Sequence, residues 1–300
     1  MSKNNTSLAM FIVLLAGLIW SFGPLVVRNL DNAELIPWQY SLIRGSTIFL
    51  ILNVYLFLNE GKKFINNYER IGYSGFIGGI CLGIANITFV LSITTTTAAV
   101  TMMMLGAMPF IAAFLAYIFL KEKISKTTLI AMVVAAIGII FISYDSKESG
   151  TLFGLINGLI SCSAFAGFTV SLRWRKKVPK LTTVSIGGIF AASASLLVLL
   201  FSDSEILISL KNTSLSSLHG FLVCSALIMY SAKAKYLPAA DLTLLSLTEV
   251  IGGIFWVWLP WLGINEVPST NTITGGFFIF MSIFYYSFIM QSNRRFIGLN

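Results

Sequence analysis

The feature that most restricts this 300-residue chain is a row of long apolar segments. We count ten: 8–28, 36–58, 72–93, 98–120, 127–144, 152–172, 181–201, 216–235, 241–263 and 271–291. A helix needs roughly 20 apolar residues to cross the hydrocarbon core of a bilayer. Membrane β-strands instead alternate apolar and polar residues over about 10 positions. The near-continuous runs therefore predict an all-α integral membrane protein with ten transmembrane helices.

The composition supports lipid as the solvent of this chain. Only 11% of the residues are charged and the mean hydropathy is +0.85, whereas soluble domains carry about 25% charged residues. Such a chain cannot cover its surface with polar groups in water. The first apolar segment continues past Trp20 without a small-residue cleavage site, so we expect no cleavable signal peptide.

The second half of the sequence repeats the first at a shift of 141 positions. The matched residues include Leu14, Gly17, Leu18 and Ile19 with Leu155, Gly158, Leu159 and Ile160, Ile48 and Phe49 with Ile189 and Phe190, and Ala98 and Ala99 with Ala239 and Ala240. After Pro109 the shift grows to 144, so that Glu122 matches Glu266. The second copy thus has about three extra residues near Pro260, which we expect to kink or end its helix. We predict two domains, 1–147 and 148–300.

Each copy contains five predicted spans. Because five is odd, the second copy must enter the membrane from the opposite side, which makes the two copies inverted repeats. Membrane proteins built from inverted repeats are typically secondary transporters, with a site near the middle of the bilayer between the halves.

The distribution of basic residues predicts the orientation. With both termini cytoplasmic, sixteen Lys and Arg residues lie at inside positions, and only Arg28, Lys147 and Lys211 lie outside. This bias also explains the net charge of +8 without a nucleic-acid partner. We therefore expect a multi-pass protein with cytoplasmic termini.

Several segments resemble the EamA domain, which occurs twice in many members of the drug/metabolite transporter superfamily. They are Leu105–Phe110 through Leu120–Glu122, Leu247–Val250 through Asn265–Glu266, Gly17–Gly23, Leu42–Gly45 and Leu237–Ala240. The resemblance implies a ten-helix inner-membrane carrier of small metabolites, often an exporter, whose helices 1, 3, 4, 6, 8 and 9 line a central cavity. One departure is Val250, which stands where the family often has proline, and it puts the bend of the ninth helix in doubt.

Two charged residues stand out because they lie well inside apolar segments, where a charge costs roughly 2.5–3.5 kcal/mol. Glu249 either faces the cavity and binds a proton or a cationic substrate group, or is a structural anchor paired with a helix end or with a lysine such as Lys233 or Lys235. Arg44 is either the counter-ion of a substrate carboxylate or a side chain that snorkels to the outer interface. Its shallow position favours snorkelling, and we do not expect a direct Arg44–Glu249 pair.

The other candidate binding residues are an amide, several aromatic rings and a thioether. Asn86 needs a hydrogen-bond partner from another helix or from a substrate. The repeat partners Phe89 and Tyr230 either stack on a substrate or pack in the core. Trp20 and Trp256 either reach the cavity or belong to an aromatic belt. Met103 suits an adaptable cavity or the core equally well. We read His219 as an interface residue and expect no metal site or cofactor.

These features favour a secondary transporter that exports small polar metabolites such as amino acids. Its energy source would be a gradient of protons or another ion, exchange, or the substrate gradient alone. The alternative is a lipid-linked flippase, in which the cluster from Arg173 to Lys180 would bind a phosphate head group. One His and isolated acids argue against an enzyme, and no polar filter suggests a channel. The expected partners are a small-molecule substrate and the lipid bilayer, and the protein would be a monomer or a homodimer.

Overall fold

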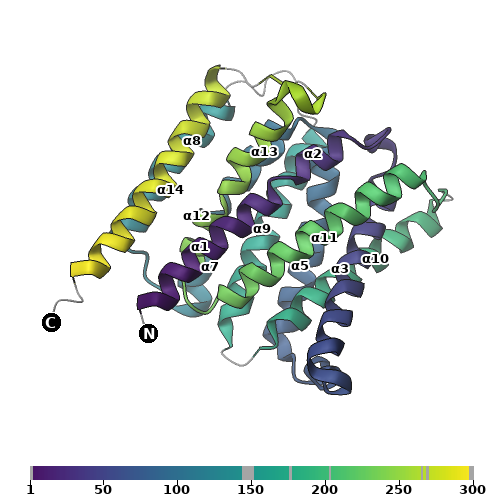
Figure 1. Ribbon diagram of the computed structural model, residues 1–300, viewed down its shortest axis with the longest axis horizontal. Helices are drawn as coiled ribbons and strands as arrows, with labels where there is room; N and C mark the ends of the chain where they lie inside the picture. The colour runs from purple at the N-terminus through teal and green to yellow at the C-terminus, as the bar shows by residue number, and fades with distance from the viewer. Residues whose placement is uncertain are drawn as a thin grey trace.

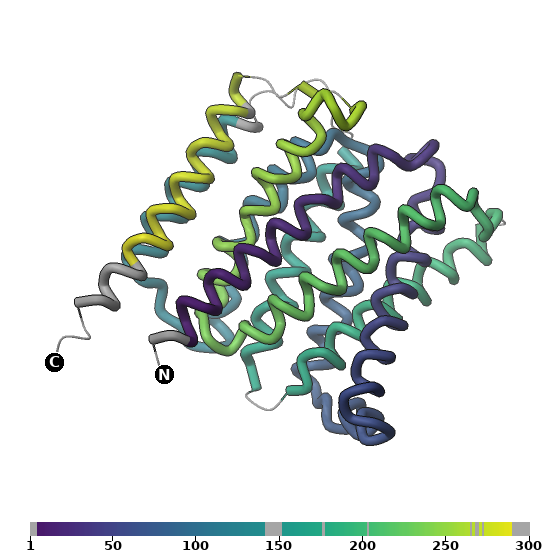
Figure 2. The backbone as a smooth tube through the Cα atoms, viewed as in Figure 1, coloured from purple at the N-terminus to yellow at the C-terminus, as the bar shows by residue number. Residues whose placement is uncertain are grey.

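The computed structural model describes residues 3–143, 152–175, 178–202, 204–264, 266–267 and 270–296. Long helices dominate these residues (Figures 1 and 2). The α-helices are α1 (Lys3–Trp20), α2 (Gly23–Arg28), α3 (Pro37–Glu60), α4 (Ile65–Glu69), α5 (Gly72–Thr95), α6 (Ala98–Leu105), α7 (Met108–Leu120), α8 (Lys126–Ser143), α9 (Leu152–Trp174), α10 (Lys180–Phe201), α11 (Leu210–Lys233), α12 (Ala239–Ser246), α13 (Thr248–Trp258) and α14 (Thr270–Phe296). Short 3-10 turns are η1 (Ala33–Leu35), η2 (Gly61–Phe64) and η4 (Pro260–Leu262).

Eight helical stretches of the described chain are long and apolar enough to cross a membrane. They include three composite spans, in which α1 joins α2, α6 joins α7 and α12 joins α13. The helices α8 and α14 contain shorter apolar stretches, Lys126–Phe141 and Ile273–Ile289. The structure therefore confirms an all-helical, multi-pass membrane protein, while the count of ten spans stays a prediction.

The helix boundaries agree with the apolar segments in most places. Helix α11 begins at Leu210, earlier than the predicted 216, because the Ser209 side chain caps it by accepting from the Asn212 amide. Helix α13 ends at Trp258, and Pro260 begins a 3-10 turn, as the proline predicted. The proposed boundary between residues 147 and 148 lies outside the described residues.

Three composite spans are interrupted near their middle. Pro24 and Pro109 lie in the first turns of α2 and α7, where a missing amide hydrogen costs no intrahelical bond. The break between α12 and α13 falls at Leu247 without a proline nearby. There the Thr248 hydroxyl shares its proton between the Leu245 carbonyl of the same span and the Leu14 carbonyl of α1, at 3.2 Å each, which ties the break to α1. The bend of this span therefore exists although Val250 replaces the family's proline.

Glycines allow the closest helix contacts. The Gly45 and Gly188 backbones bring α3 against α10: a Cβ on Gly45 would lie 2.7 Å from the Gly188 carbonyl oxygen. Gly17 of α1 packs against Thr248 at the α12–α13 break. Its repeat partner Gly158 of α9 packs against α6, where an added Cβ would lie 2.8 Å from the Met104 Cβ. Each of these contacts joins one half of the chain to the other.

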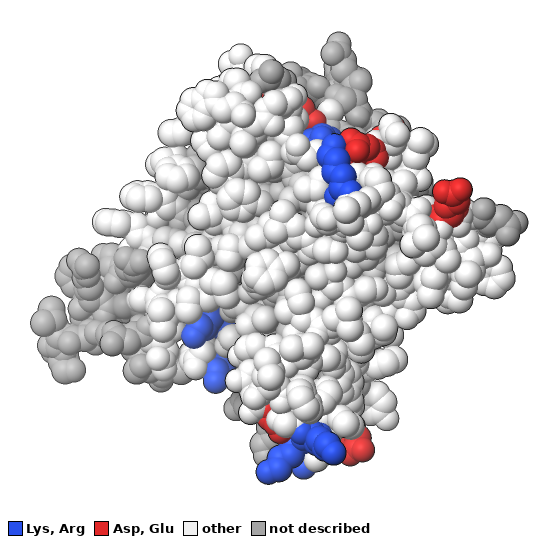
Figure 3. Space-filling model, turned by 45° about the vertical axis from the view of Figure 1, so that its right-hand side comes forward, with Lys and Arg blue, Asp and Glu red and all other residues white. Residues whose placement is uncertain are grey.

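The surface also fits a lipid environment. Large apolar side chains such as Phe11, Phe114, Leu152 and Phe277 are more than half exposed. In Figure 3 the charged side chains gather at two ends of the visible face, with a broad uncharged band between them. Helices α8 and α14 pack against each other at one edge of the bundle (Figure 1).

Candidate functional site

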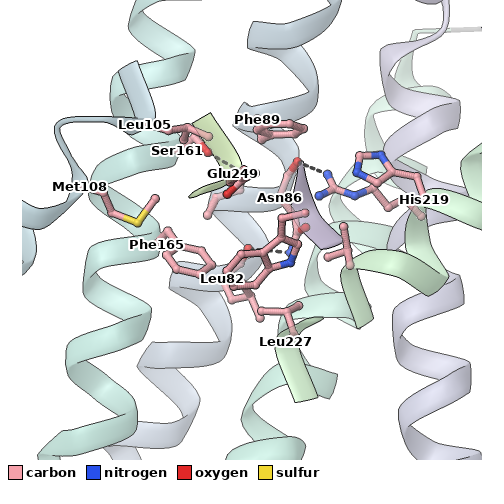
Figure 4. Close-up of a pocket in the computed structure, with 14 residues that line it drawn as sticks. Leu82, Asn86, Phe89, Leu105, Met108, Ser161, Phe165, His219, Leu227 and Glu249 are labelled. Atoms are coloured by element: carbon pink, nitrogen blue, oxygen red, sulfur yellow. Dashed lines mark hydrogen bonds between the residues drawn. The ribbon is translucent and has the colours of Figure 1, made fainter. Parts of the chain in front are cut away.

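A small cavity lies where α1, α3, α5, α9, α11 and α13 meet, and fourteen side chains line it (Figure 4). Its volume is about 50 Å³, which is room for a water or two, whereas small-molecule sites commonly reach about 300 Å³ or more. Five of the eight residues proposed from the sequence line it: Trp20, Arg44, Asn86, Phe89 and Glu249. The structure is therefore closed around a polar and aromatic centre.

Arg44 is buried in this cavity, with only 6% of its surface exposed. Its guanidinium carbon lies 5.2 Å from the centre of the Phe89 ring, and its Nη1 donates to the Asn86 carbonyl at 3.3 Å. Its Nε has no hydrogen-bond partner. Snorkelling to the outer interface is thus wrong for Arg44, because packing against Phe89 holds the charge inside. The guanidinium keeps donor capacity for a further group.

Glu249 lies in the first turn of α13, directly after the helix break, where the helix dipole favours a negative charge. Its carboxylate has neither an ion pair nor a hydrogen bond with any described residue, and Arg44 interacts with it across the cavity. Lys233 and Lys235 instead lie over the Tyr236 ring, at 5.8 and 4.9 Å. The alternative of a lysine-paired anchor is not what the structure shows.

Asn86 and Ser161 place polar groups in the same space. The Asn86 side-chain amide donates to the Leu82 carbonyl at 3.0 Å, within its own helix. The Ser161 hydroxyl donates to the Ala85 carbonyl at 2.9 Å and so joins α9 to α5. In Figure 4 Asn86, Glu249 and Ser161 lie between Phe89 on one side and Phe165 and Leu82 on the other. Asn86 satisfies its donor locally, without a hydrogen bond to another helix.

His219 is buried beside Arg44, rather than at the interface expected from the sequence. Only 2% of its surface is exposed, and its Nδ1 is hydrogen-bonded to the Tyr40 hydroxyl. Its ring lies 6.3 Å from that of Phe89, and its Nε2 faces Gly23, where an added Cβ would lie 2.9 Å away. Helix α11 begins two turns earlier than predicted, which carries His219 inward along the bundle.

The remaining proposed residues lie behind the cavity wall. Tyr230 is fully buried, with its ring 5.4 Å from Trp20 and its hydroxyl 2.8 Å from the Thr169 hydroxyl. Trp256 stacks on Phe22 at 4.6 Å and donates to the Ser21 hydroxyl at 2.8 Å. Met103 belongs to the packed core, and Met108 lines the cavity instead. The structure therefore brings five of the eight together and places these three in the surrounding shell.

Sequence reasoning missed Ser161, Phe165 and His219, which all line the cavity. The repeat could have indicated Ser161, because it lies 141 positions after Trp20. Helical spacing could have indicated His219, because it lies three turns before Tyr230 on one face of α11. Phe165 follows Ser161 by four residues, also on one helix face. Within the described chain, no cluster of three or more His, Cys, Asp or Glu could hold a metal ion.

Comparisons with protein families, curated proteins and solved structures each find similarity to this chain. Residues 7–144 match the model of the EamA-like transporter family. The pseudopaline exporter CntI of Pseudomonas aeruginosa (strain UCBPP-PA14) is 27% identical over 176 residues, which cover 57% of this chain and 59% of that relative, less than two thirds of its length. A crystal structure with 14% sequence identity covers 95% of this chain and 98% of its own, with a TM-score of 0.74. At that identity the last match shows the fold alone.

Proposed function

We propose that this chain, whose residues 7–144 match the model of the EamA-like transporter family, is a secondary transporter that exports small polar metabolites. Amino acids and related compounds are the proposed cargo, moved by alternating access across the inner membrane with both termini in the cytoplasm. The observation that carries this proposal is the cavity lined by the buried Arg44 and the partly buried Glu249, two charges of opposite sign without a direct ion pair. Intramembrane charges are costly and usually mark substrate or ion pathways.

The lining of the cavity supports the proposed inverted repeat. Eight of the fourteen lining residues form four pairs separated by the repeat shift of 141: Trp20 with Ser161, Leu82 with Val223, Asn86 with Leu227, and Met108 with Glu249. Helix packing follows the same relation, since α5 packs on α9 as α1 packs on α11. A site on the axis between two inverted halves is reached equally from either side of the membrane.

The chemistry of the cavity favours a substrate with a carboxylate. The Arg44 guanidinium has an unused Nε donor and can bind a carboxylate with charge-assisted hydrogen bonds. Glu249 can receive a cationic group of the substrate or a coupling proton. Apolar and aromatic side chains such as Leu227, Phe165 and Trp20 complete the wall. A relative that exports pseudopaline is consistent with a polar metabolite as cargo.

The alternative of a lipid-linked flippase receives less support. It would use the basic cluster from Arg173 to Lys180 to bind a phosphate head group. The Arg173 guanidinium is already engaged by the Glu122 carboxylate and two carbonyl oxygens. Lys176 and Lys177 lie outside the described residues. Phosphate-dependent binding of lipid to the purified protein would favour this alternative.

A thermal-shift screen of the purified protein against metabolites, followed by transport of each hit into proteoliposomes, tests the proposal. We expect stabilisation by compounds with a carboxylate, and loss of that stabilisation in Glu249→Gln or Arg44→Gln. Glu205→Gln, a change on an exposed loop, is the matched control. Unchanged stabilisation in both cavity variants would remove the cavity from the mechanism.

A further inference from the structure

Two ion pairs outside the cavity each tie three segments together. At the end of α2, the Arg28 Nε bonds the Glu266 carboxylate. The Nη1 of Arg28 donates to the Ile93 carbonyl at 3.0 Å, and its Nη2 donates to the Thr96 carbonyl at 2.8 Å. All of the guanidinium nitrogens are thus engaged. The contact joins the first span, the end of α5 and the segment after α13.

The second ion pair lies at the end of α9. The Arg173 Nε donates to the Glu122 Oε1 at 2.9 Å, and its Nη1 donates to the Ala234 carbonyl at 2.7 Å and also to the Leu237 carbonyl. The other Glu122 oxygen, Oε2, accepts from the Ala239 amide at 3.1 Å. This contact joins α9, the segment after α7 and the connection from α11 to α12.

The residues that the two arginines bind are related by the sequence repeat, whereas the arginines themselves lie 145 positions apart, about one helical turn from the shift of 141. Arg28 binds the carbonyls of Ile93 and Thr96. Arg173 binds the carbonyls of Ala234 and Leu237, which follow Ile93 and Thr96 by 141 positions each. The two glutamates differ by the shift of 144 that applies after the fourth span. Each arginine lies in the first span of one half and binds the glutamate that follows the fourth span of the other half.

The two pairs lie at opposite ends of α5. Arg28 binds carbonyls at and beyond its C-terminal end. At its N-terminal end, the Ser74 hydroxyl donates to the Ser171 carbonyl at 3.0 Å, two residues before Arg173. Helix α5 has 24 residues, so the two ends are about 36 Å apart at 1.5 Å per residue. We call Arg28–Glu266 the outer pair and Arg173–Glu122 the inner pair, following the proposed orientation.

A layer of aromatic rings lies between each pair and the cavity. On the outer side, the Phe22 ring stacks on Trp256, and Phe22 lies two residues after the cavity residue Trp20. On the inner side, the Tyr230 ring packs against Phe165 with centres 5.5 Å apart, and its hydroxyl bonds Thr169, one turn before Arg173. Each ion pair therefore fastens the helices that carry one ring layer.

We propose that the outer pair and the inner pair are the two gates of the transport cycle, and that the structure is the occluded state with both gates closed. This inference rests on the proposed alternating access. Opening toward the cytoplasm breaks the inner pair and keeps the outer pair, and opening to the other side does the reverse. Because each guanidinium also holds two backbone carbonyls, a gate opens by releasing all three contacts together.

The test measures access to the cavity from each side, in a background with Cys81, Cys162 and Cys224 replaced by alanine. Met108→Cys in the cavity wall reports access to a membrane-impermeant thiol reagent applied to sealed vesicles of either orientation. We expect Glu122→Gln to raise labelling from the inner side roughly fivefold and to lower it from the outer side, because removing one gate shifts the population toward that opening. Glu266→Gln should have the opposite effect.

Two further sets of variants serve as a control and as a safeguard against misfolding. Asp31→Asn removes the exposed ion pair with Lys211 and should leave labelling unchanged. Arg28→Lys and Arg173→Lys keep the charge but lose the forked donors, and should shift labelling in the same directions by a smaller amount. The proposal would be overturned if Glu122→Gln and Glu266→Gln raised labelling from the same side. It would also be overturned if their labelling changed no more than that of Asp31→Asn.

The labelling needs no substrate, so it separates this inference from the proposed function. A protein that moves none of the tested metabolites but shows opposite shifts in Glu122→Gln and Glu266→Gln keeps the gates and refutes the cargo. A protein that transports metabolites without those shifts keeps the function and refutes the gates.

Discussion

The two halves of the molecule share a scaffold but not a chemistry. The glycines Gly17 and Gly158 pack against the fourth span of the opposite half, and both of these spans are broken at positions 141 apart. The charged groups of the cavity do not repeat: Glu249 corresponds to Met108, and Arg44 corresponds to Ser185. Under the proposed mechanism, the shared scaffold would provide the motion, while the substrate, which has no such symmetry, would be bound by unlike residues.

Ser185 shows how different the corresponding positions have become. Its hydroxyl bonds the Asn53 side chain at 2.8 Å and the Tyr68 hydroxyl at 2.7 Å, away from the cavity. Replacing the packing glycines Gly17 and Gly158 should therefore have similar effects in the two halves. Replacing a charged cavity residue should have a larger effect than replacing the residue that corresponds to it in the other half.

The largest effect is expected at Arg44. Replacing it with glutamine removes the cation that a carboxylate would need, and a charge-assisted contact worth about 3 kcal/mol corresponds to roughly 100-fold lower transport. Ser185→Ala, at the repeat-related position, should change transport less than about twofold. Initial rates of uptake into proteoliposomes measure both. Equal losses of transport rate in Arg44→Gln and Ser185→Ala would contradict different roles for the two positions.

Glu249→Gln should lower transport by about tenfold or more, as expected when one charged contact of about 1.5 kcal/mol is lost. If Glu249 carries the coupling proton, the variant should also lose the dependence of transport on external pH. The measurement is the transport rate across about pH 5 to 8. Met108→Leu, at the corresponding position, should keep the pH profile, and a Glu249→Gln variant with the original profile would exclude proton coupling through this residue.

The scaffold glycines should respond alike. Gly17→Val and Gly158→Val each force side-chain atoms into a helix contact that has no space, at a cost of about 1–3 kcal/mol. Both should lower the midpoint of thermal unfolding in detergent by several degrees. Gly276→Val, on α14 with no atom near an added Cβ, should leave the midpoint unchanged. A lower unfolding midpoint in only one of Gly17→Val and Gly158→Val would argue against equivalent packing in the two halves.

The smallest effect is expected at Tyr40, which holds His219 beside Arg44. Tyr40→Phe removes one buried hydrogen bond worth about 1 kcal/mol and leaves the ring in place. Transport should fall about fivefold while the folded yield is kept. The ratio of rates for wild type and variant measures this, and an unchanged rate would show that His219 does not depend on Tyr40 for its position.

The sequence predicted the helices well because long apolar runs have one stable form in lipid. It predicted Glu249 and Arg44 as candidates because charges within such runs are costly. It did not predict that Arg44 is buried, because a charged side chain near a segment end can point to the membrane interface or into the protein. Only the packing against Phe89 determines that Arg44 points inward. His219 was missed because α11 extends past the apolar segment, under a serine cap that hydropathy does not detect.

The small volume of the closed cavity has a pharmacological consequence. The cavity of about 50 Å³ is too small to hold a compound the size of a metabolite. An inhibitor that bound inside an open form and was then enclosed would escape only as often as the protein reopened. Its residence time would follow the frequency of that reopening rather than the strength of its own contacts.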